Sequence, residues 1–346
     1  MNIGASTGGR ASLDEWQDFM VDEAKFPVTV QVQAPARLHL GFLDPGAHLG
    51  RSYGSVGVAL EGIVTRVRVS AADGFRVSGY QDRPVRLVVE RLRAALGLPL
   101  SGHVHVQEAI RPHAGLGSGT QLALAVGTAF CRFHGRRLEA REVAGIVGRG
   151  RRSGIGIAAF EQGGFLVDGG RGEATVTPPL IARFPVPSQW RWLLIYDPGA
   201  EGLSGVRERA AFAQLPRFSR SVAADLCHRL LIQGLPALAE GDYRAFCEVL
   251  AAIQRANGDY FAPAQGGRYA SSRVAEALAW LRRRRWTGLG QSSWGPTGFC
   301  LLPDPETAAR EARALEAAFA PSGLHFQVVA SRNRGAEILG RCAPDC

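Results

Sequence analysis

Residues 111–127, RPHAGLGSGTQLALAVG, constrain the fold most strongly, because a glycine-rich turn runs directly into an apolar, helix-like stretch. Glycines let the backbone turn tightly with its N–H groups pointing inward, and a helix N-terminus adds partial positive charge. Together these features can cradle a phosphate group. The segment has neither the lysine of a Walker sequence nor the last glycine of a dinucleotide fingerprint. It predicts an anion-binding loop of another kind, with a tight turn into a buried helix as the alternative.

The predicted phosphate loop is GLGSG, residues 115–119, at the start of that helix. Its backbone N–H groups are the expected donors to an anion, and two hydroxyl groups stand beside them. We therefore predict that substrate phosphate contacts these residues: Gly115, Leu116, Gly117, Ser118, Gly119 and Thr120.

A second polar stretch, residues 34–62, begins as a strand and continues into a glycine-rich return. Arg37 and His39 fall on one face of the strand, because side chains two residues apart point the same way. Arg51 and Tyr53 lie in the return. Two guanidinium groups near one pocket suit forked recognition of phosphate or carboxylate. We predict that Arg51 and Tyr53 bind substrate, and an exposed surface charge is the alternative for each arginine.

A third stretch, residues 288–302, places Gln291, Ser292 and Ser293 on a tight glycine- and proline-containing turn between two predicted strands. Polar side chains at this density beside glycines are typical of a ligand-facing turn. An ordinary hairpin explains the pattern equally well. We predict that these three residues bind substrate.

The chain has 346 residues, which fits one large domain or two fused domains. Strand-like and helix-like segments follow one another without regular β-α-β alternation, which favours an α+β architecture of two layered sheets. The proline-rich passage at 176–190 would stop helices and central strands, so we place a domain boundary there. We expect a loose arm at 1–26, an N-terminal domain at 27–180 and a C-terminal domain at 190–340.

The charge balance points to anionic partners. Forty basic and 31 acidic residues give a net charge of +9, and Lys25 is the only lysine. Nucleic acid, an acidic membrane surface and a phosphorylated substrate all fit this charge. Basic residues interleaved with aromatic ones are missing, and no apolar run approaches the roughly 18 residues of a membrane span, so we expect neither nucleic acid nor membrane as partner. Six cysteines without a CxxC pair predict free thiols and a cytoplasmic location.

The three stretches, in this order and spacing, resemble the GHMP kinase superfamily. GLGSG matches its phosphate-loop motif, and the turn at 291–298 matches its C-terminal glycine motif. The resemblance implies two domains, an N-terminal domain like that of ribosomal protein S5 and a C-terminal ferredoxin-like α/β sandwich. The kinases carry a catalytic aspartate where SGIGIAAFEQGG, residues 153–164, has Gly156, and Arg37 replaces the usual opening lysine. Phosphoryl transfer would therefore lack its usual base.

Within that superfamily, APARLHLGFLD, RSYGSVGVAL, GLSG at 202–205 and GQSSWGPTGF resemble the beta-ribofuranosylaminobenzene 5'-phosphate synthase family. That family condenses phosphoribosyl pyrophosphate with 4-aminobenzoate or 4-hydroxybenzoate, releasing CO2 and pyrophosphate, in tetrahydromethanopterin biosynthesis. The resemblance implies a homodimeric pentosyltransferase that uses Mg2+. We predict Arg37 and Asp197 as catalytic residues and Asp44 and Glu201 as magnesium ligands.

Two other functions remain open. The first is an ATP-dependent small-molecule kinase in which Glu161 or Asp197 replaces the missing base. The second is an anion- or nucleic-acid-binding protein that has kept the fold and lost catalysis. ATP consumption without phosphoribosyl pyrophosphate would favour the kinase, and salt-dependent nucleic-acid binding without turnover would favour the binding protein.

Overall fold

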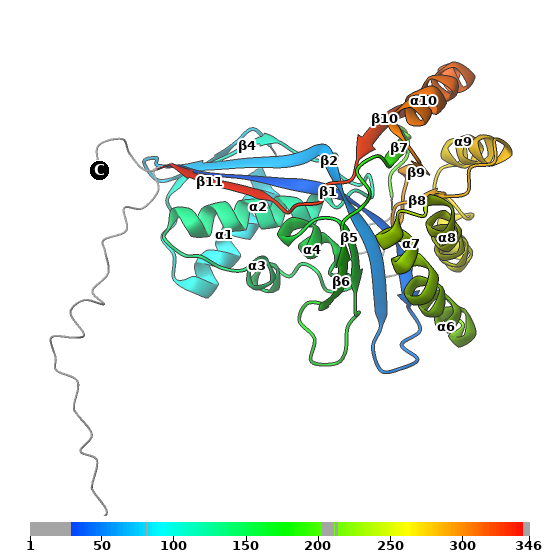
Figure 1. The fold of residues 1–346 in the computed structure, drawn as a ribbon. Helices are drawn as coiled ribbons and strands as arrows, with labels where there is room; N and C mark the ends of the chain where they lie inside the picture. The colour runs from blue at the N-terminus through cyan, green and yellow to red at the C-terminus, as the bar shows by residue number, and fades with distance from the viewer. Residues whose placement is uncertain (1–28, 81, 203–210, 212–213, 342–346) are drawn as a thin grey trace, which may run out of the picture.

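The computed structural model describes residues 29–341 except 81, 203–210 and 212–213. Within them the predicted α+β architecture is confirmed, because helices pack on two separate sheets (Figure 1). The predicted arm at 1–26 lies outside the described residues.

The first sheet has the strand order β11-β1-β2-β4-β3, with β5 paired to β2 and β6 paired to β5. Period-two alternation in β1 turns Val30 and Val32 toward the helices of this unit. Helix α2 is buried along most of its length because it packs between β1, β2, α1 and α3. The elements of this unit are β1 (Thr29–Asp44), β2 (Tyr53–Ser70), β3 (Phe75–Ser78), α1 (Asp82–Leu96), β4 (Gly102–Glu108), α2 (Ser118–Phe133), α3 (Ala140–Ile146), α4 (Ile155–Glu161), β5 (Phe165–Asp168), β6 (Leu180–Phe184) and β11 (Glu337–Arg341).

The second sheet has the order β10-β7-β9-β8 and is buried on both faces. In β7, Trp192 and Leu194 join one core and Leu193 and Ile195 join another, as the alternation of a strand requires. The elements of this unit are β7 (Arg191–Tyr196), α6 (Arg220–Arg229), the π-helical η2 (Leu230–Gly234), α7 (Leu235–Glu240), α8 (Tyr243–Gln265), α9 (Ser272–Arg283), β8 (Leu289–Gln291), β9 (Gly298–Leu302), α10 (Pro305–Phe319), the 3-10 turn η3 (Ala320–Ser322) and β10 (His325–Ala330).

The two units share a hydrophobic core. Leu38 and Leu40 of β1 pack in the same cluster as Trp192 of β7 and Phe299 of β9. Strand β1 therefore runs from the core of the first unit into the junction between the two. Residues at this point of β1 can contact loops from both halves of the chain.

The sheet pairing differs from the predicted domain limits at two places. Strand β6, residues 180–184, pairs with β5 and so extends the first unit beyond residue 180. Strand β11 pairs with β1, with Thr29 opposite Arg341, although the prediction placed residues up to 340 in the C-terminal domain. This strand therefore joins the first sheet through a partner at the other end of the described chain.

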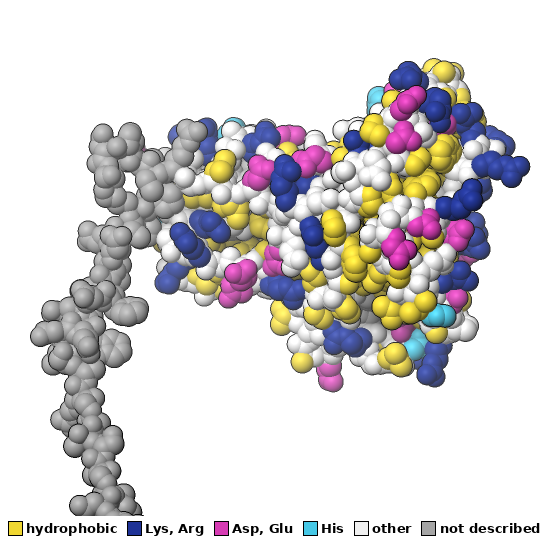
Figure 2. All heavy atoms as spheres, in the orientation of Figure 1, with side chains coloured by type: hydrophobic (Ala, Val, Ile, Leu, Met, Phe, Trp, Pro, Cys, Tyr) yellow, Lys and Arg dark blue, Asp and Glu magenta, His cyan; other side chains and the backbone are white. Residues whose placement is uncertain are grey.

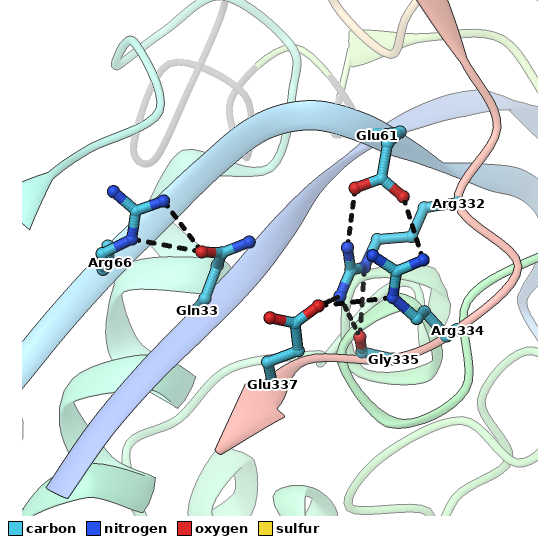
Figure 3. A network of polar contacts seen from close by, with 7 residues as sticks. All are labelled: Gln33, Glu61, Arg66, Arg332, Arg334, Gly335 and Glu337. Carbon is cyan, nitrogen blue, oxygen red and sulfur yellow. Dashed lines mark hydrogen bonds and ion pairs between the residues drawn. The ribbon is translucent and has the colours of Figure 1, made fainter. Parts of the chain in front are cut away.

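A buried arginine fastens the returning C-terminal segment to the first sheet (Figure 3). The Arg332 side chain is 1% exposed and donates hydrogen bonds to Glu61 at 2.8 Å, Glu337 at 2.9 Å and the carbonyl of Gly335. Its backbone N–H donates to the carbonyl of Ala59 in β2 at 2.9 Å. These contacts fix the segment that leads from β10 into β11.

Among the described residues, no helix is both long and apolar enough to cross a membrane. Cys131, Cys227, Cys247 and Cys300 are free thiols, as predicted. Cys342 and Cys346 lie outside the described residues. On the face shown in Figure 2, basic side chains are scattered among acidic and apolar ones.

Candidate active site

The glycine-rich loop forms the centre of the candidate site and rests on Arg37. Gly115 and Gly117 have φ angles of 78° and 84°, which favour glycine, and Gly117 caps the start of α2. Arg37 Nη1 donates a hydrogen bond of 2.5 Å to the Gly115 carbonyl, and the Arg37 backbone N–H donates to the Leu116 carbonyl at 3.1 Å. The guanidinium group therefore lies directly beside the predicted phosphate loop.

The turn after β8 packs against the other side of the same loop. Ser292 Oγ donates to the Gly115 carbonyl at 2.7 Å and accepts from the His39 backbone N–H at 3.0 Å. A Cβ atom at Gly115 would lie 2.6 Å from the Ser292 carbonyl oxygen, so only glycine fits there. All three stretches identified in the sequence meet at this point.

The polar side chains of the turn hold its shape. Gln291 Oε1 accepts from the Ala270 N–H at 2.7 Å, and the Gln291 N–H donates to Gln254 at 2.8 Å. The Ser293 N–H donates to the His39 carbonyl at 3.0 Å. Predicted as ligand-facing residues, Gln291 and Ser292 are buried and hydrogen-bonded to other protein groups. They position the loop and β1 relative to each other.

Arg149 is a residue at this site that the sequence did not single out. Its guanidinium lies over the start of α2, with Nη1 3.4 Å from where a Cβ on Gly119 would stand. The described residues provide no hydrogen bond or ion pair to its side chain, which is exposed. Burial of part of the group and the nearby charge of Arg91 lower the pKa of Arg149, which stays cationic. An unneutralised cation at a helix N-terminus is suited to an anionic ligand.

Gly156, which the resemblance predicts to stand where the kinases carry an aspartate, lies against the same helix. A Cβ there would be 3.0 Å from Thr120 Cγ2, and the Gly156 carbonyl accepts from Gln121 Nε2 at 2.7 Å. The close packing confirms that this position faces the start of α2. The residue at this position brings no base to the phosphate loop.

A buried carboxylate near the start of α4, that of Asp168, is hydrogen-bonded to protein groups. Asp168 is 1% exposed and accepts hydrogen bonds from Ser55, Ser153 and the backbone of Gly154 and Gly170. Burial raises the pKa of Asp168, and these four donors oppose that rise. The carboxylate joins β2, β5 and the start of α4, and every hydrogen bond described here comes from a protein group.

Asp197, predicted as catalytic, is tied to α9. Both of its carboxylate oxygens pair with the Arg273 guanidinium, and Ser271 Oγ donates to it at 2.5 Å. The Gly199 N–H donates to it at 2.9 Å. The carboxylate is 4% exposed and anchors the loop that follows β7. These contacts favour a structural role.

The two predicted magnesium ligands belong to different elements. Asp44 accepts from the backbone N–H groups of Gly46 and His48 and contacts His48 Nδ1 at 2.7 Å, which closes the turn after β1. Glu201 is exposed on the loop after β7. No group of three or more His, Cys, Asp or Glu suited to a metal ion occurs among the described residues. Asp44 and Glu201 therefore belong to no such group, and a magnesium ion that binds mainly through substrate phosphates stays a prediction.

Arg51 and Tyr53, predicted to bind substrate, lie where the chain enters β2. Arg51 donates to the carbonyls of Gly169 and Gly170 at 2.8 Å and so joins the hairpin to the turn after β5. Tyr53 lies 5.4 Å from Phe42, ring to ring. These contacts connect parts of the first unit and do not involve the phosphate loop.

A cavity of about 190 Å³ opens beside the phosphate loop. Thr297 is 1% exposed, and its hydroxyl has no hydrogen-bond partner within the described part of the chain. The lining comes from three segments: residues 111–114, residues 196–201 and the turn at 296–297. Its volume suits a small organic molecule rather than a macromolecule.

Family models match both halves of the chain. The GHMP kinases N terminal domain matches residues 83–164, and the GHMP kinases C terminal domain matches residues 235–321. Among solved structures, homoserine kinase from Cytophaga hutchinsonii is similar with a TM-score of 0.63 and 17% identity, covering 90% of this chain and 98% of that one. Mevalonate diphosphate decarboxylase from Staphylococcus aureus is similar with a TM-score of 0.64 and 16% identity over 90% and 98%. The predicted GHMP kinase-like fold is confirmed.

Curated relatives narrow the family. The beta-ribofuranosylphenol 5'-phosphate synthase of Archaeoglobus fulgidus is 31% identical over 323 residues, which is 89% of this chain and 99% of that protein. The synthases of the same name from Methanothermobacter thermautotrophicus and Methanocaldococcus jannaschii are 34% and 30% identical, each over 64% of this chain and 74% and 76% of their own length. The chain is an enzyme of the glycosyltransferase type, and it belongs to the beta-ribofuranosylphenol 5'-phosphate synthase family on the GHMP kinase fold.

Proposed function

We propose that this enzyme transfers the phosphoribosyl group of phosphoribosyl pyrophosphate to 4-hydroxybenzoate or 4-aminobenzoate, releasing CO2 and pyrophosphate. The names of the relatives describe a ribofuranosylphenol product, which favours the hydroxybenzoate. The product would enter tetrahydromethanopterin biosynthesis in the cytoplasm. A homodimer is part of the same proposal, and light scattering would test it against the 37.0 kDa of one chain.

One observation carries the proposal: two arginines lie beside the phosphate loop, while glycine stands at the predicted position of the kinase base. Arg37 and Arg149 lie beside the loop, and Gly156 packs against Thr120 in place of an aspartate. Such a site favours a donor with a strongly anionic leaving group over a reaction that needs proton abstraction.

The proposed reaction fits a site without a base. Pyrophosphate leaves C1 of the ribose with the electron pair of the C–O bond, and the ring carbon that bears the carboxylate attacks the resulting cationic carbon. The C–CO2 bond then breaks, and its electron pair restores the aromatic ring. The group that leaves the ring is CO2 rather than a proton, so no side chain has to accept one. The loop and Arg37 would bind the departing pyrophosphate and orient the donor.

Mg2+ is proposed only as a companion of the pyrophosphate group. Magnesium commonly binds through substrate phosphates and water with one or two protein carboxylates. The assay therefore includes it, and no step is assigned to a protein-bound ion.

The test uses purified protein with Mg2+, phosphoribosyl pyrophosphate and carboxyl-labelled 4-hydroxybenzoate, with 4-aminobenzoate and ATP in separate arms. We expect labelled CO2 that requires phosphoribosyl pyrophosphate, with an equal amount of pyrophosphate. ADP formation from ATP, with no CO2 from either benzoate, would replace the proposal with the kinase.

The kinase is the weaker candidate because both acids that could replace its base are engaged. Glu161 Oε2 lies 3.8 Å from Arg141 Nε, and the Asp197 carboxylate forms an ion pair with Arg273. Burial raises the pKa of Glu161, and the charge of Arg141 opposes that rise.

A further inference from the structure

We propose that His39 binds the hydroxyl or amino group that lies para to the carboxylate of the aromatic acceptor, an inference that rests on the proposed pentosyl transfer. The cavity beside His39 would receive that substituent. The ring itself would then lie toward Arg37 and the phosphate loop.

The His39 side chain is buried, with an exposed fraction of 3%. Among the residues that the structure describes, neither Nδ1 nor Nε2 has a hydrogen-bond partner. The imidazole belongs to β1, whose backbone is fixed here by Ser292 and Ser293. Leaving a buried polar group unpaired costs about 1–3 kcal/mol, so a ligand that supplies the missing partner gains affinity.

The chemistry of a neutral imidazole suits a hydroxyl or amino group. Burial and the charge of Arg37 lower the pKa of His39 to about 3, so the ring is uncharged at neutral pH. An uncharged imidazole has one acceptor nitrogen and one donor N–H. A phenol O–H or an aniline N–H can donate to the acceptor nitrogen.

The surroundings of His39 combine aromatic rings with polar side chains, among them Gln254, Asn257 and Arg268, which line the same cavity. The ring centroids of His39 and Phe42 are 4.6 Å apart. The Phe261 ring continues this cluster, with its centroid 6.1 Å from that of Phe42 and 4.3 Å from that of Trp294. His39, Phe42 and Phe261 line one cavity of about 20 Å³. That volume holds a group the size of one water molecule and not a benzene ring. The substituent alone fits there.

The spacing of Arg37 and His39 along β1 is comparable to the length of a para-substituted benzoate. Arg37 and His39 are two residues apart in a regular stretch of the β1–β2 ladder, so they share a face with Cα atoms roughly 7 Å apart. Arg37 is at the phosphate loop. A ring whose substituent meets His39 would direct its carboxylate-bearing carbon toward a donor bound at the loop.

This contact would also assist the reaction. When the ring carbon forms its bond to ribose, positive charge develops on the para substituent, and its O–H or N–H becomes a stronger hydrogen-bond donor. His39 would accept that stronger bond while the proton stays on the substituent. Loss of CO2 then returns the electron pair to the ring and removes the charge.

The experiment measures binding and turnover separately in the wild type, His39→Phe and His39→Gln, with His103→Phe as the matched control. His103 lies on β4 and is hydrogen-bonded to Ser78. Titration calorimetry with 4-hydroxybenzoate, 4-aminobenzoate and unsubstituted benzoate gives the binding preference, and CO2 release gives kcat and KM. Thermal unfolding of each variant checks the fold, and we expect His39→Phe to be at least as stable as the wild type because it removes unpaired polar atoms.

We expect the wild type and His103→Phe to bind 4-hydroxybenzoate about tenfold more tightly than benzoate, since one hydrogen bond to a buried group contributes about that factor. His39→Phe should lose the preference, His39→Gln should keep part of it, and the KM for phosphoribosyl pyrophosphate should not change. A preference that survives in His39→Phe, a loss confined to phosphoribosyl pyrophosphate, or a wild type without preference would each overturn the inference. If the preference depends on His39 but no CO2 is released, the binding site stands and the proposed reaction fails.

Discussion

The Ser292 hydroxyl donates a 2.7 Å hydrogen bond to the carbonyl of Gly115, 177 positions earlier in the chain. The same oxygen accepts from the His39 backbone, so one buried side chain joins the phosphate loop, β1 and the turn after β8.

We expect Ser292→Ala to lower the free energy of unfolding by about 1–3 kcal/mol, because the His39 N–H loses this acceptor. It should also raise the KM for phosphoribosyl pyrophosphate. Denaturant unfolding and CO2-release kinetics measure the two effects, and exposed Ser221→Ala should change stability by less than about 0.5 kcal/mol. Equal effects of the two substitutions would contradict this assignment.

The donor-binding role of the loop can be tested with Arg37 and Ser118. Removing a charged donor to phosphate costs about 1.5–3 kcal/mol, so Arg37→Ala should lower kcat/KM for phosphoribosyl pyrophosphate by about 10- to 100-fold. Ser118→Ala loses a neutral donor and should lower it by about 10-fold or less. Arg86→Ala, on the exposed face of α1, is the control. Wild-type kinetics in Arg37→Ala and Ser118→Ala would remove both residues from the site.

The glycine in the kinase base position predicts the outcome of restoring an aspartate. Gly156→Asp should form no ADP from ATP and should raise the KM for phosphoribosyl pyrophosphate, because a carboxylate beside Thr120 repels phosphate. Gly156→Asn has the same size without the charge, so the difference between the two variants isolates the electrostatic effect. A pair with identical KM values would show that phosphate does not bind here.

The Arg332 network should contribute strongly to stability. Arg332→Met removes hydrogen bonds to Glu61, Glu337 and Gly335 and should lower the free energy of unfolding by about 2 kcal/mol, since the two carboxylates left behind are partly hydrated. Arg334 is 64% exposed and contacts the same two acids. Arg334→Met should cost less than about 1 kcal/mol. Chemical denaturation measures the free energy of unfolding of both variants. Equal losses would show that the burial of Arg332 does not strengthen its contacts.

His39 predicts a pH dependence of stability. Its pKa is about 3 in the folded protein, below the ordinary value of 6.5. The unfolded chain therefore binds a proton that the folded chain does not, and stability falls as the pH drops below 6.5. Between pH 7 and pH 5 this group should remove about 2 kcal/mol of stability. In His39→Phe that part of the loss should be absent, which unfolding curves at the two pH values would show. An unchanged pH dependence would mean that His39 takes up its proton equally in the folded and the unfolded chain.

Local sequence patterns predicted the elements that carry the site. The glycine turn before α2, the alternation in β1 and the turn after β8 all lie where expected. These elements meet through contacts between residues far apart in the chain, such as Gly115 and Ser292. Local patterns carry no information about such distances. The same polarity that suggested a ligand-facing turn at Gln291 and Ser292 serves buried hydrogen bonds, because a turn without regular backbone pairing needs side-chain partners.

Arg149 and Asp197 show why side-chain roles were harder to predict. In the sequence Arg149 is one of many arginines, and only packing places it over the start of α2. Asp197 follows a strand beside glycines, as a catalytic acid would, and its pairing with Arg273 depends on a helix 76 positions away. Strand β11 was missed for a related reason, since its partner β1 is formed by the first described residues.

Because β11 pairs with β1, the first sheet can be completed only after the last described strand has been synthesised. When the ribosome has made residue 330, every strand of the second sheet exists, but β1 still lacks its outer neighbour. Its edge then offers unpaired N–H and C=O groups, the feature that lets strands of different molecules join. The first strand of the described fold therefore keeps an unpaired edge until β11, the last described strand, has been made and moves the edge of the sheet outward by one strand.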